Sequence, residues 1–211
     1  MATVKTWLLV AAERREFDGI LERFGASERL NWPVEFACEA HYRGDRYVMV
    51  ANGPGRRLAG KALEKRIDVD GIVSTGFCGA LDPALRVGDV VTDAGAVYCV
   101  DRVIVSAAEK RALRETTGAA AVDMESAAVA AKAAEWGVPF HFIRAVSDAA
   151  CDDMPLDFNL YRDPQGRFSR GRITLAALAR PFMRVPALLR LDRNTKIAAR
   201  SLGAYFADCR L

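Results

Sequence analysis

The chain has 211 residues, 51% of them hydrophobic, and a formal net charge of only +3. This length allows one large domain or two small ones, and the apolar content supplies a core and argues against intrinsic disorder. The charge is uneven, because residues 161–211 hold 11 Lys and Arg against 3 Asp, a net +8, whereas the first 160 residues carry −5. We interpret the basic segment as the solvated face of C-terminal helices. Nucleic acid, an anionic membrane surface and anionic ligands are the alternatives.

The chain has an odd number of cysteines, five, and no pair of them has CxxC spacing. They are Cys38, Cys78, Cys99, Cys151 and Cys209. With only His41 and His141 besides, the sequence predicts no metal site. Reduced cysteines are typical of a cytoplasmic protein. The apolar run at residues 7–12 is too short to span a membrane and has no usual cleavage site, so we expect a soluble cytoplasmic protein.

Patterns of strands and helices alternate along the chain. In order, they predict strands at 7–12, 34–40, 46–51, 71–75, 87–94, 96–105, 120–124 and 139–146. Helices are expected at 13–24, after the glycine-rich turn at 52–55, and at 107–116, 125–136, 170–179 and 186–206. This alternation favours a single α/β domain over residues 1–211, with a parallel or mixed sheet covered by helices. The polar stretch 151–169 is predicted to be an active-site loop, and 170–211 to form C-terminal helices.

Polar residues gather where the predicted strands end. Since ligands of open α/β sheets bind at the carboxyl ends of the strands, these residues are candidates for a site. They are Glu13 and Glu16, Gly76 and Cys78, Glu125, and Ser147 with Asp148. Each carboxylate has a plain alternative as a helix cap or a first-turn acid. Together, they favour proton donation and charge stabilisation on one small molecule, with Asp148 suited to a general acid.

Three motifs resemble the purine and uridine phosphorylase superfamily, which includes methylthioadenosine/adenosylhomocysteine nucleosidases. They are STGFCGALDPALRVGDVV (Ser74 to Val91), AVDMESAA (Ala121 to Ala128) and RAVSDAA (Arg144 to Ala150). The resemblance covers most of residues 5–150. It implies a three-layer αβα sandwich with a central mixed sheet, and cleavage of the N-glycosidic bond of a purine nucleoside.

The resemblance also implies roles for individual residues. Glu125 would hydrogen-bond the ribose hydroxyls, and Asp148, beside Ser147, would protonate or hydrogen-bond purine N7. The sugar and base pocket would be lined by Met124, Gly76, Phe77 and Cys78. An acid after the first strand activates water in the hydrolytic branch. Glu13 and Glu16 both match it, and we favour Glu13 because it directly follows the strand. Asp123 is expected to be structural.

Two positions depart from the family pattern. The arginine of the phosphorolytic motif R-x-G-[ST] is absent from GIVSTGFCG, and Arg14, Arg15, Arg56 and Arg57 are the alternative cations. The turn of Gly53 and Gly55, with Arg56, is the candidate phosphate site. Val103 stands where the family has a base-stacking phenylalanine. Phosphate and water both stay open as the nucleophile, and no other cofactor is implied.

The C-terminal segment is similar to the end of hopanoid-associated phosphorylases, which are linked to removal of adenine from an adenosylated hopane. Such a lipid substrate would suit peripheral membrane contact by the basic helices. The family resemblance further implies a homodimer or larger assembly and no nucleic-acid partner. The alternative is a catalytically inactive nucleoside-binding protein of the same fold.

Overall fold

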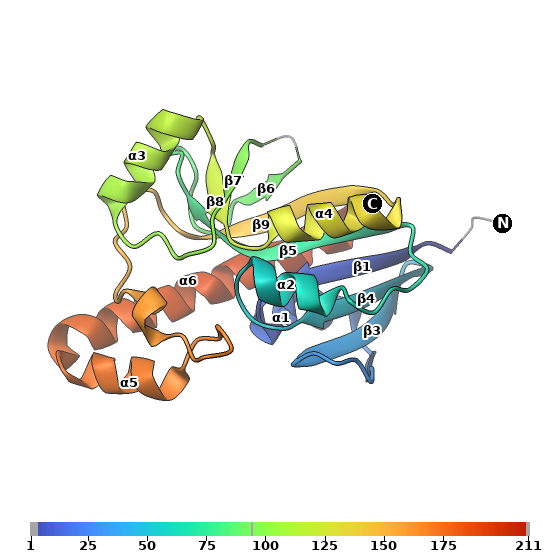
Figure 1. Ribbon diagram of the computed structural model, residues 1–211, viewed down its shortest axis with the longest axis horizontal. Coiled ribbons are helices and arrows are strands. Elements are labelled where there is room, and N and C mark those ends of the chain that lie inside the picture. The colour runs from blue at the N-terminus through green and yellow to red at the C-terminus, as the bar shows by residue number, and fades with distance from the viewer. Residues whose placement is uncertain (1–3, 94, 210–211) are drawn as a thin grey trace.

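The computed structural model describes residues 4–93 and 95–209. In these residues, one mixed sheet of nine strands is covered by helices (Figure 1). The strands are β1 (Thr6–Ala11), β2 (Ser27–Arg29), β3 (Phe36–Tyr42), β4 (Asp45–Ala51), β5 (Gly71–Ala80), β6 (Val90–Thr92), β7 (Val97–Cys99), β8 (Ala121–Asp123) and β9 (Phe140–Asp148). The helices are α1 (Asp18–Phe24), α2 (Arg56–Ala62), α3 (Ala107–Thr117), α4 (Ser126–Trp136), α5 (Arg170–Leu178) and α6 (Pro181–Asp208), with the 3-10 helices η1 (Arg14–Phe17) and η2 (Phe158–Tyr161).

The sheet has the strand order β2-β3-β4-β1-β5-β8-β7, and β9 pairs with β5 and β6. Strands β1, β5 and β9 run parallel, so their carboxyl ends lie at one rim, as predicted. β8 runs against β5 and pairs Val122 with Gly79. The residues after β8 therefore reach the rim from the opposite direction, which the prediction of a parallel or mixed sheet leaves open.

Alternate residues of the central strands face two different cores. Leu8 and Val10 pack with α2 and α4 on one face of the sheet, whereas Leu9 and Ala11 pack with α1 and α6 on the other. This period of two is the direct consequence of strand geometry. The result is a three-layer αβα arrangement, visible in Figure 1, and the predicted fold class is confirmed.

Helix α6 has two different surroundings along its length. Its C-terminal half is buried through Ala198, Leu202 and Phe206, which belong to the core beneath α1. Gly203 permits a close crossing there, since a Cβ on it would lie 2.1 Å from the Gly19 carbonyl oxygen. The N-terminal half extends away from the sheet and forms a hairpin with α5 (Figure 1).

Most predicted elements match the observed ones, with differences at their ends. The strand expected at 71–75 continues to Ala80, and the one expected at 96–105 is only three residues long. The last helix begins at Pro181 and encloses Pro186, whereas the sequence pattern predicts a start at Pro186. Among the described helices, none has the length and apolar character to cross a bilayer.

Candidate active site

A cavity of about 800 Å³ lies at the rim where β1, β5 and β9 end. Its walls combine residues from the strand ends with residues from the 151–169 loop and the α5–α6 hairpin. The predicted residues on these walls are Glu13, Glu16, Phe77, Cys78, Val103, Met124, Glu125, Ser147 and Asp148. The fold thus brings together side chains that are more than 130 residues apart in sequence.

Glu16, in η1 just after β1, is one of the buried acids of the site. Its Oε2 accepts hydrogen bonds from the backbone N–H groups of Ala12 (2.7 Å) and Glu13 (3.1 Å), and its Oε1 accepts one from Phe77 (3.2 Å). Burial raises the pKa of this carboxyl from 4.5 to about 7, although the Arg144 charge lowers it. Glu16 therefore exchanges a proton near neutral pH, as a general acid or base requires.

Gly76 makes room for Glu16. Its φ is +115°, and a Cβ added there would lie 2.6 Å from the Glu16 Oε2. The glycine expected to line the sugar pocket therefore acts chiefly by admitting the buried carboxylate.

Glu13 lies at the cavity too, but in a different environment. Its side chain is 21% exposed and forms an ion pair of 2.6 Å with Arg15. Both acids were candidates from the sequence. Glu16 is the buried one, and its pKa lies near neutral pH. The preference for Glu13 followed its position directly after the strand, whereas the turn of η1 places Glu16 above the strand ends.

Glu125, the N-cap residue of α4, lies 3% exposed between two partners. Its Oε1 accepts a hydrogen bond from the Gly55 N–H (2.8 Å), and its Oε2 lies 2.9 Å from the Arg144 guanidinium. Burial raises the pKa of the Glu125 carboxyl, and the charge of Arg144 opposes that shift. This fixed acceptor lies on the cavity wall, where a sugar hydroxyl can donate to it.

Asp123 supports the start of α4. It accepts hydrogen bonds from the N–H groups of Glu125 (3.1 Å) and Ser126 (2.7 Å), and from the Ser126 hydroxyl (2.6 Å). It also pairs with Arg144 at 3.2 Å. These contacts agree with the structural role expected for it, although Asp123 also lies on the cavity wall.

Arg144 is the central cation of this cluster. It projects from β9, is 1% exposed, and donates to the Phe77 carbonyl oxygen (2.8 Å) and the Ser74 hydroxyl (3.1 Å). Burial alone lowers the pKa of its guanidinium, but the carboxylates around it raise the pKa above its usual value. A single charge thus holds Asp123 and Glu125 in place, a role that the sequence motif did not reveal.

Asp148 ends β9 and is 6% exposed. Its Oδ2 lies 2.6 Å from the Lys110 ammonium, and its Oδ1 lies 2.6 Å from the Ser147 hydroxyl. Ser147 itself lies 3.3 Å from the Cys78 carbonyl oxygen. The two residues of the Ser-Asp motif are therefore adjacent on the wall, next to a lysine that no motif in the sequence marks.

Aromatic side chains for a base come from the C-terminal part of the chain. Val103 is on the wall, but Phe158 and Phe168 also face the cavity, with their ring centroids 5.9 Å apart. They can supply the apolar surface that Val103 lacks. Both lie in the stretch predicted to be an active-site loop, where a phenylalanine carries no signal of its position.

The predicted phosphate turn is occupied by contacts within the protein. The Gly53 N–H donates to the Ala12 carbonyl oxygen (2.8 Å), and the Gly55 N–H donates to Glu125. The Arg56 side chain reaches the Cys99 carbonyl oxygen (2.6 Å). These glycine amides are therefore directed to other groups, and the turn serves to position Glu125.

Comparison with known proteins agrees with this arrangement. The model of the phosphorylase superfamily matches residues 90–184, which contain both the AVDMESAA and the RAVSDAA motifs. Together with the fold, this match confirms the predicted resemblance to that superfamily.

Particular relatives are nucleosidases. The 5′-methylthioadenosine/S-adenosylhomocysteine nucleosidases of Shewanella sp. (strain W3-18-1) and Shewanella baltica (strain OS155 / ATCC BAA-1091) are 36% identical to this chain over 77 residues, which is 36% of its length. The match spans only 33% of the length of these curated relatives.

Solved structures show the same fold. The futalosine hydrolase of Helicobacter pylori strain 26695 has a TM-score of 0.71 at 16% identity, over 96% of both chains. The S-adenosylhomocysteine nucleosidase of Streptococcus pyogenes, in complex with 5-methylthiotubericidin, has a TM-score of 0.69 at 15% identity, over 100% of this chain and 99% of that one.

Proposed function

We propose that the protein cleaves the N-glycosidic bond of an adenosine-type purine nucleoside and releases the free base, with water as the nucleophile. The observation that carries this proposal is the meeting of Glu16, Glu125 and Asp148 on the wall of one cavity. The near-neutral pKa of Glu16 suits it to take a proton from water.

The reaction divides among these three carboxyl groups. The C1′–N9 bond breaks and its electron pair passes to the base, which takes a proton at N7 from the carboxyl group of Asp148. The water oxygen bonds to C1′, and the proton it loses passes to Glu16. Glu125 accepts hydrogen bonds from the ribose hydroxyls and thereby steadies the sugar as positive charge develops on it.

Water is favoured over phosphate by the contacts of the candidate anion site. The amides of Gly53 and Gly55 are directed to other acceptors, and Arg15 is paired with Glu13. Inorganic phosphate as a co-substrate is the alternative within the same reaction. No metal or organic cofactor has a role in the proposed steps.

The test is to incubate the protein with adenosine and with 5′-methylthioadenosine, with and without phosphate, and to follow free adenine. Release without phosphate supports hydrolysis, whereas release only with phosphate selects phosphorolysis. Binding of nucleosides without any turnover would support an inactive nucleoside-binding protein instead. The absence of both nucleoside binding and turnover would refute the proposal.

A substrate with a large apolar 5′ group, such as an adenosylated hopane, is a narrower proposal from the similarity of the C-terminal segment. Ile173, Leu188 and Leu191 of the α5–α6 hairpin give the cavity an apolar wall, which supports it. A series of adenosines with longer 5′-alkylthio groups should show rising kcat/KM. A preference for the unsubstituted 5′-hydroxyl would contradict this proposal alone.

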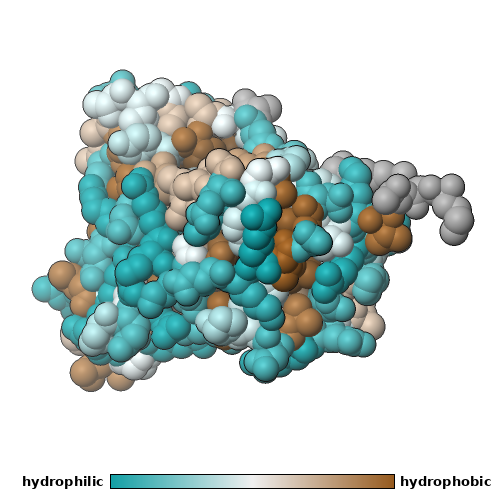
Figure 2. All heavy atoms as spheres, turned by 45° about the vertical axis from the view of Figure 1, so that its right-hand side comes forward, coloured by the Kyte–Doolittle hydropathy of each residue, from teal (hydrophilic) through white to brown (hydrophobic). Residues whose placement is uncertain are grey.

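Peripheral contact with an anionic membrane is proposed for the same hairpin. Leu175, Leu178, Phe182 and Met183 are 72%, 61%, 94% and 72% exposed. Residues 168–190 contain five arginines and no acidic residue. In Figure 2, hydrophobic residues stand out at the lower left, where the hairpin lies. Apolar side chains among arginines suit the interface of an anionic bilayer.

Co-sedimentation with vesicles that contain phosphatidylglycerol, but not with pure phosphatidylcholine, would support this contact. Changing Phe182 and Met183 to serine should weaken binding, whereas Tyr98→Ser, which removes an exposed ring on β7, should not. Lack of binding even at low salt would refute membrane contact.

We further propose that the protein is cytoplasmic and forms a homodimer or a larger assembly. The family resemblance supports the assembly, and the five free cysteines suit a reducing compartment. Light scattering during size-exclusion chromatography tests the assembly, and a mass of 23.1 kDa, that of one chain, would contradict it.

A further inference from the structure

Lys110 is a buried cation in contact with the proposed acid. It lies in the first turns of α3 and is 1% exposed. Its ammonium donates to the Asp148 Oδ2 (2.6 Å), the Ala149 carbonyl oxygen (2.7 Å) and the Asp152 carbonyl oxygen (3.1 Å). An ammonium has three N–H donors, so each has an acceptor and the group is held in one orientation.

The position of Lys110 in α3 is unfavourable for the helix itself. The N-terminal end of a helix carries partial positive charge, which repels a cation in the first turns. Removing a lysine from water also costs free energy unless the charge is paired and hydrogen-bonded. The contacts with Asp148 and the two carbonyl oxygens supply that compensation, which ties the location of Lys110 to the end of β9.

Arg144 and Lys110 are both buried, and they contact different carboxyl groups on the cavity wall. Arg144 holds Asp123 and Glu125, which lie on the side proposed for the sugar. Lys110 holds Asp148, on the side proposed for the base. Because Ser147 contacts the other oxygen of Asp148, both oxygens of this carboxyl group have a fixed neighbour.

We propose that Lys110 is a positioning residue for Asp148, an inference that rests on the proposed function. Its ammonium fixes Oδ2, so that the carboxyl group meets purine N7 in one orientation, and it stabilises the carboxylate that remains when Asp148 gives its proton to N7. Its hydrogen bonds to the carbonyl oxygens of Ala149 and Asp152 also attach the segment after β9 to α3, and thereby fix the position of the end of β9 in the cavity wall. Lys110 itself makes no bond to the substrate in this role.

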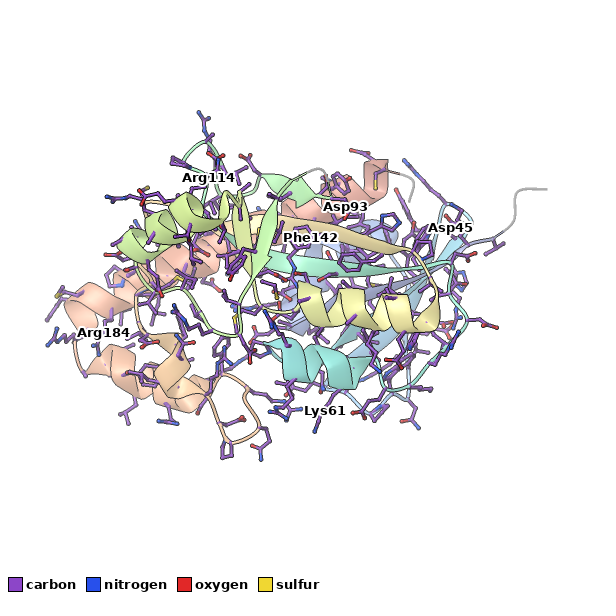
Figure 3. The ribbon with its side chains drawn as sticks, turned by 45° about the horizontal axis from the view of Figure 1, so that its top comes forward. Asp45, Lys61, Asp93, Arg114, Phe142 and Arg184 are labelled. Carbon is purple, nitrogen blue, oxygen red and sulfur yellow. The ribbon has the colours of Figure 1, made fainter. Side chains whose placement is uncertain are left out.

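The α3 helix offers a matched control. Arg114 lies on the same helix (Figure 3) and forms an ion pair of 2.6 Å with Asp82, at 35% and 28% side-chain exposure. Its loss removes a contact that attaches α3, but none to a carboxyl group of the cavity. Arg114→Met therefore measures the effect of weakening the attachment of α3 alone.

The experiment compares Lys110→Met, Lys110→Arg and Arg114→Met after folding has been checked by circular dichroism. For Lys110→Met we expect kcat for adenine release to fall roughly 10- to 100-fold, because small misplacements of a catalytic group have effects of this size. KM should rise by at most about tenfold, the loss expected for one hydrogen bond to N7. Lys110→Arg should recover part of the loss, and Arg114→Met should keep the wild-type kcat.

A purine nucleoside methylated at N7 separates positioning from general damage to the fold. Its base already carries the positive charge that protonation would supply, so its cleavage should be nearly equal in wild type, Lys110→Met and Asp148→Asn. Equal losses on the methylated and ordinary nucleosides would overturn the proposal, and so would wild-type kcat in Lys110→Met.

Binding of adenine gives a readout without turnover. Lys110→Met should bind adenine about tenfold more weakly than wild type, because the hydrogen bond that an oriented Asp148 carboxyl group donates to N7 is lost. Unchanged binding would overturn the role of Lys110 while leaving the reaction in place. A wild-type protein that neither binds nor releases adenine would overturn the proposed function itself, and this role with it.

Discussion

Replacing Glu16 with glutamine is expected to remove most of the catalytic activity and its dependence on pH. In the proposed reaction the ionised carboxylate takes a proton from water, which an amide cannot do. General acid–base catalysis by one side chain commonly contributes about 10²- to 10⁴-fold, so kcat/KM should fall by that order. Glu13→Gln, which alters the partly exposed neighbour paired with Arg15, should change kcat/KM less than about threefold.

The magnitude of the pH effect follows from the environment of Glu16. Burial raises its pKa from 4.5 to about 7, which corresponds to about 3 kcal/mol of added cost for the ionised form. With this pKa, the ionised fraction rises about tenfold between about pH 6 and pH 8. In wild type, kcat/KM should therefore rise by about the same factor over this interval, and level off above it.

The assay is the release of adenine from 5′-methylthioadenosine at a series of pH values, at constant ionic strength. The two carboxyl oxygens of Glu16 accept hydrogen bonds from three backbone N–H groups, whereas glutamine has only one side-chain oxygen. Folding of the variant must therefore be verified by circular dichroism. A folded Glu16→Gln protein that keeps the wild-type rate, or the same rise with pH, would refute the assignment of Glu16 as the base. An equal loss of kcat/KM in Glu13→Gln would refute the choice of Glu16 over Glu13.

Three further predictions concern the same cluster. Between pH 4.5 and about 7 the folded protein keeps a proton on Glu16 that the unfolded chain loses. The free energy of unfolding should therefore decrease over this interval by up to about 3 kcal/mol. Urea titration should show a smaller decrease in Glu16→Gln. Gly76→Ala should lower both the melting temperature and the activity, since its Cβ would lie 2.6 Å from Glu16 in a backbone of positive φ, and an unchanged melting temperature would contradict this. Arg144→Met should destabilise the protein by about 3–5 kcal/mol, because Asp123 and Glu125 stay buried without their cation, and a loss under about 1 kcal/mol by urea titration would contradict it.

Sequence patterns predicted the sheet and the helices that cover it, because the apolar periods of its strands are regular. The strand ends also located Glu125 and Asp148, since each follows a short buried run. Strand direction was harder: β8 contributes only three residues, and no local pattern states that it runs against β5. Its direction depends on pairing with the extended end of β5, a contact between distant parts of the chain.

The charged contacts of the site could not be predicted in the same way. Lys110 has the sequence of an ordinary helical lysine, and only the position of α3 over the end of β9 makes it buried. Arg144 did carry a signal, since it interrupts the apolar strand FHFIRAV, where a charge must have buried partners. The choice between Glu13 and Glu16 needed the turn of η1, which the sequence does not specify.

Helix α6 links the core of the protein to the wall of the cavity. Leu188, Leu191 and Thr195 face the cavity, whereas the crossing of Gly203 over α1 lies further along the same helix. Because a helix is stiff along its axis, a substitution that separates α6 from α1 would tilt its other end and reshape the cavity without altering any residue that touches substrate. Variation in substrate preference among similar chains can therefore originate in core residues, and a comparison restricted to cavity residues would miss it.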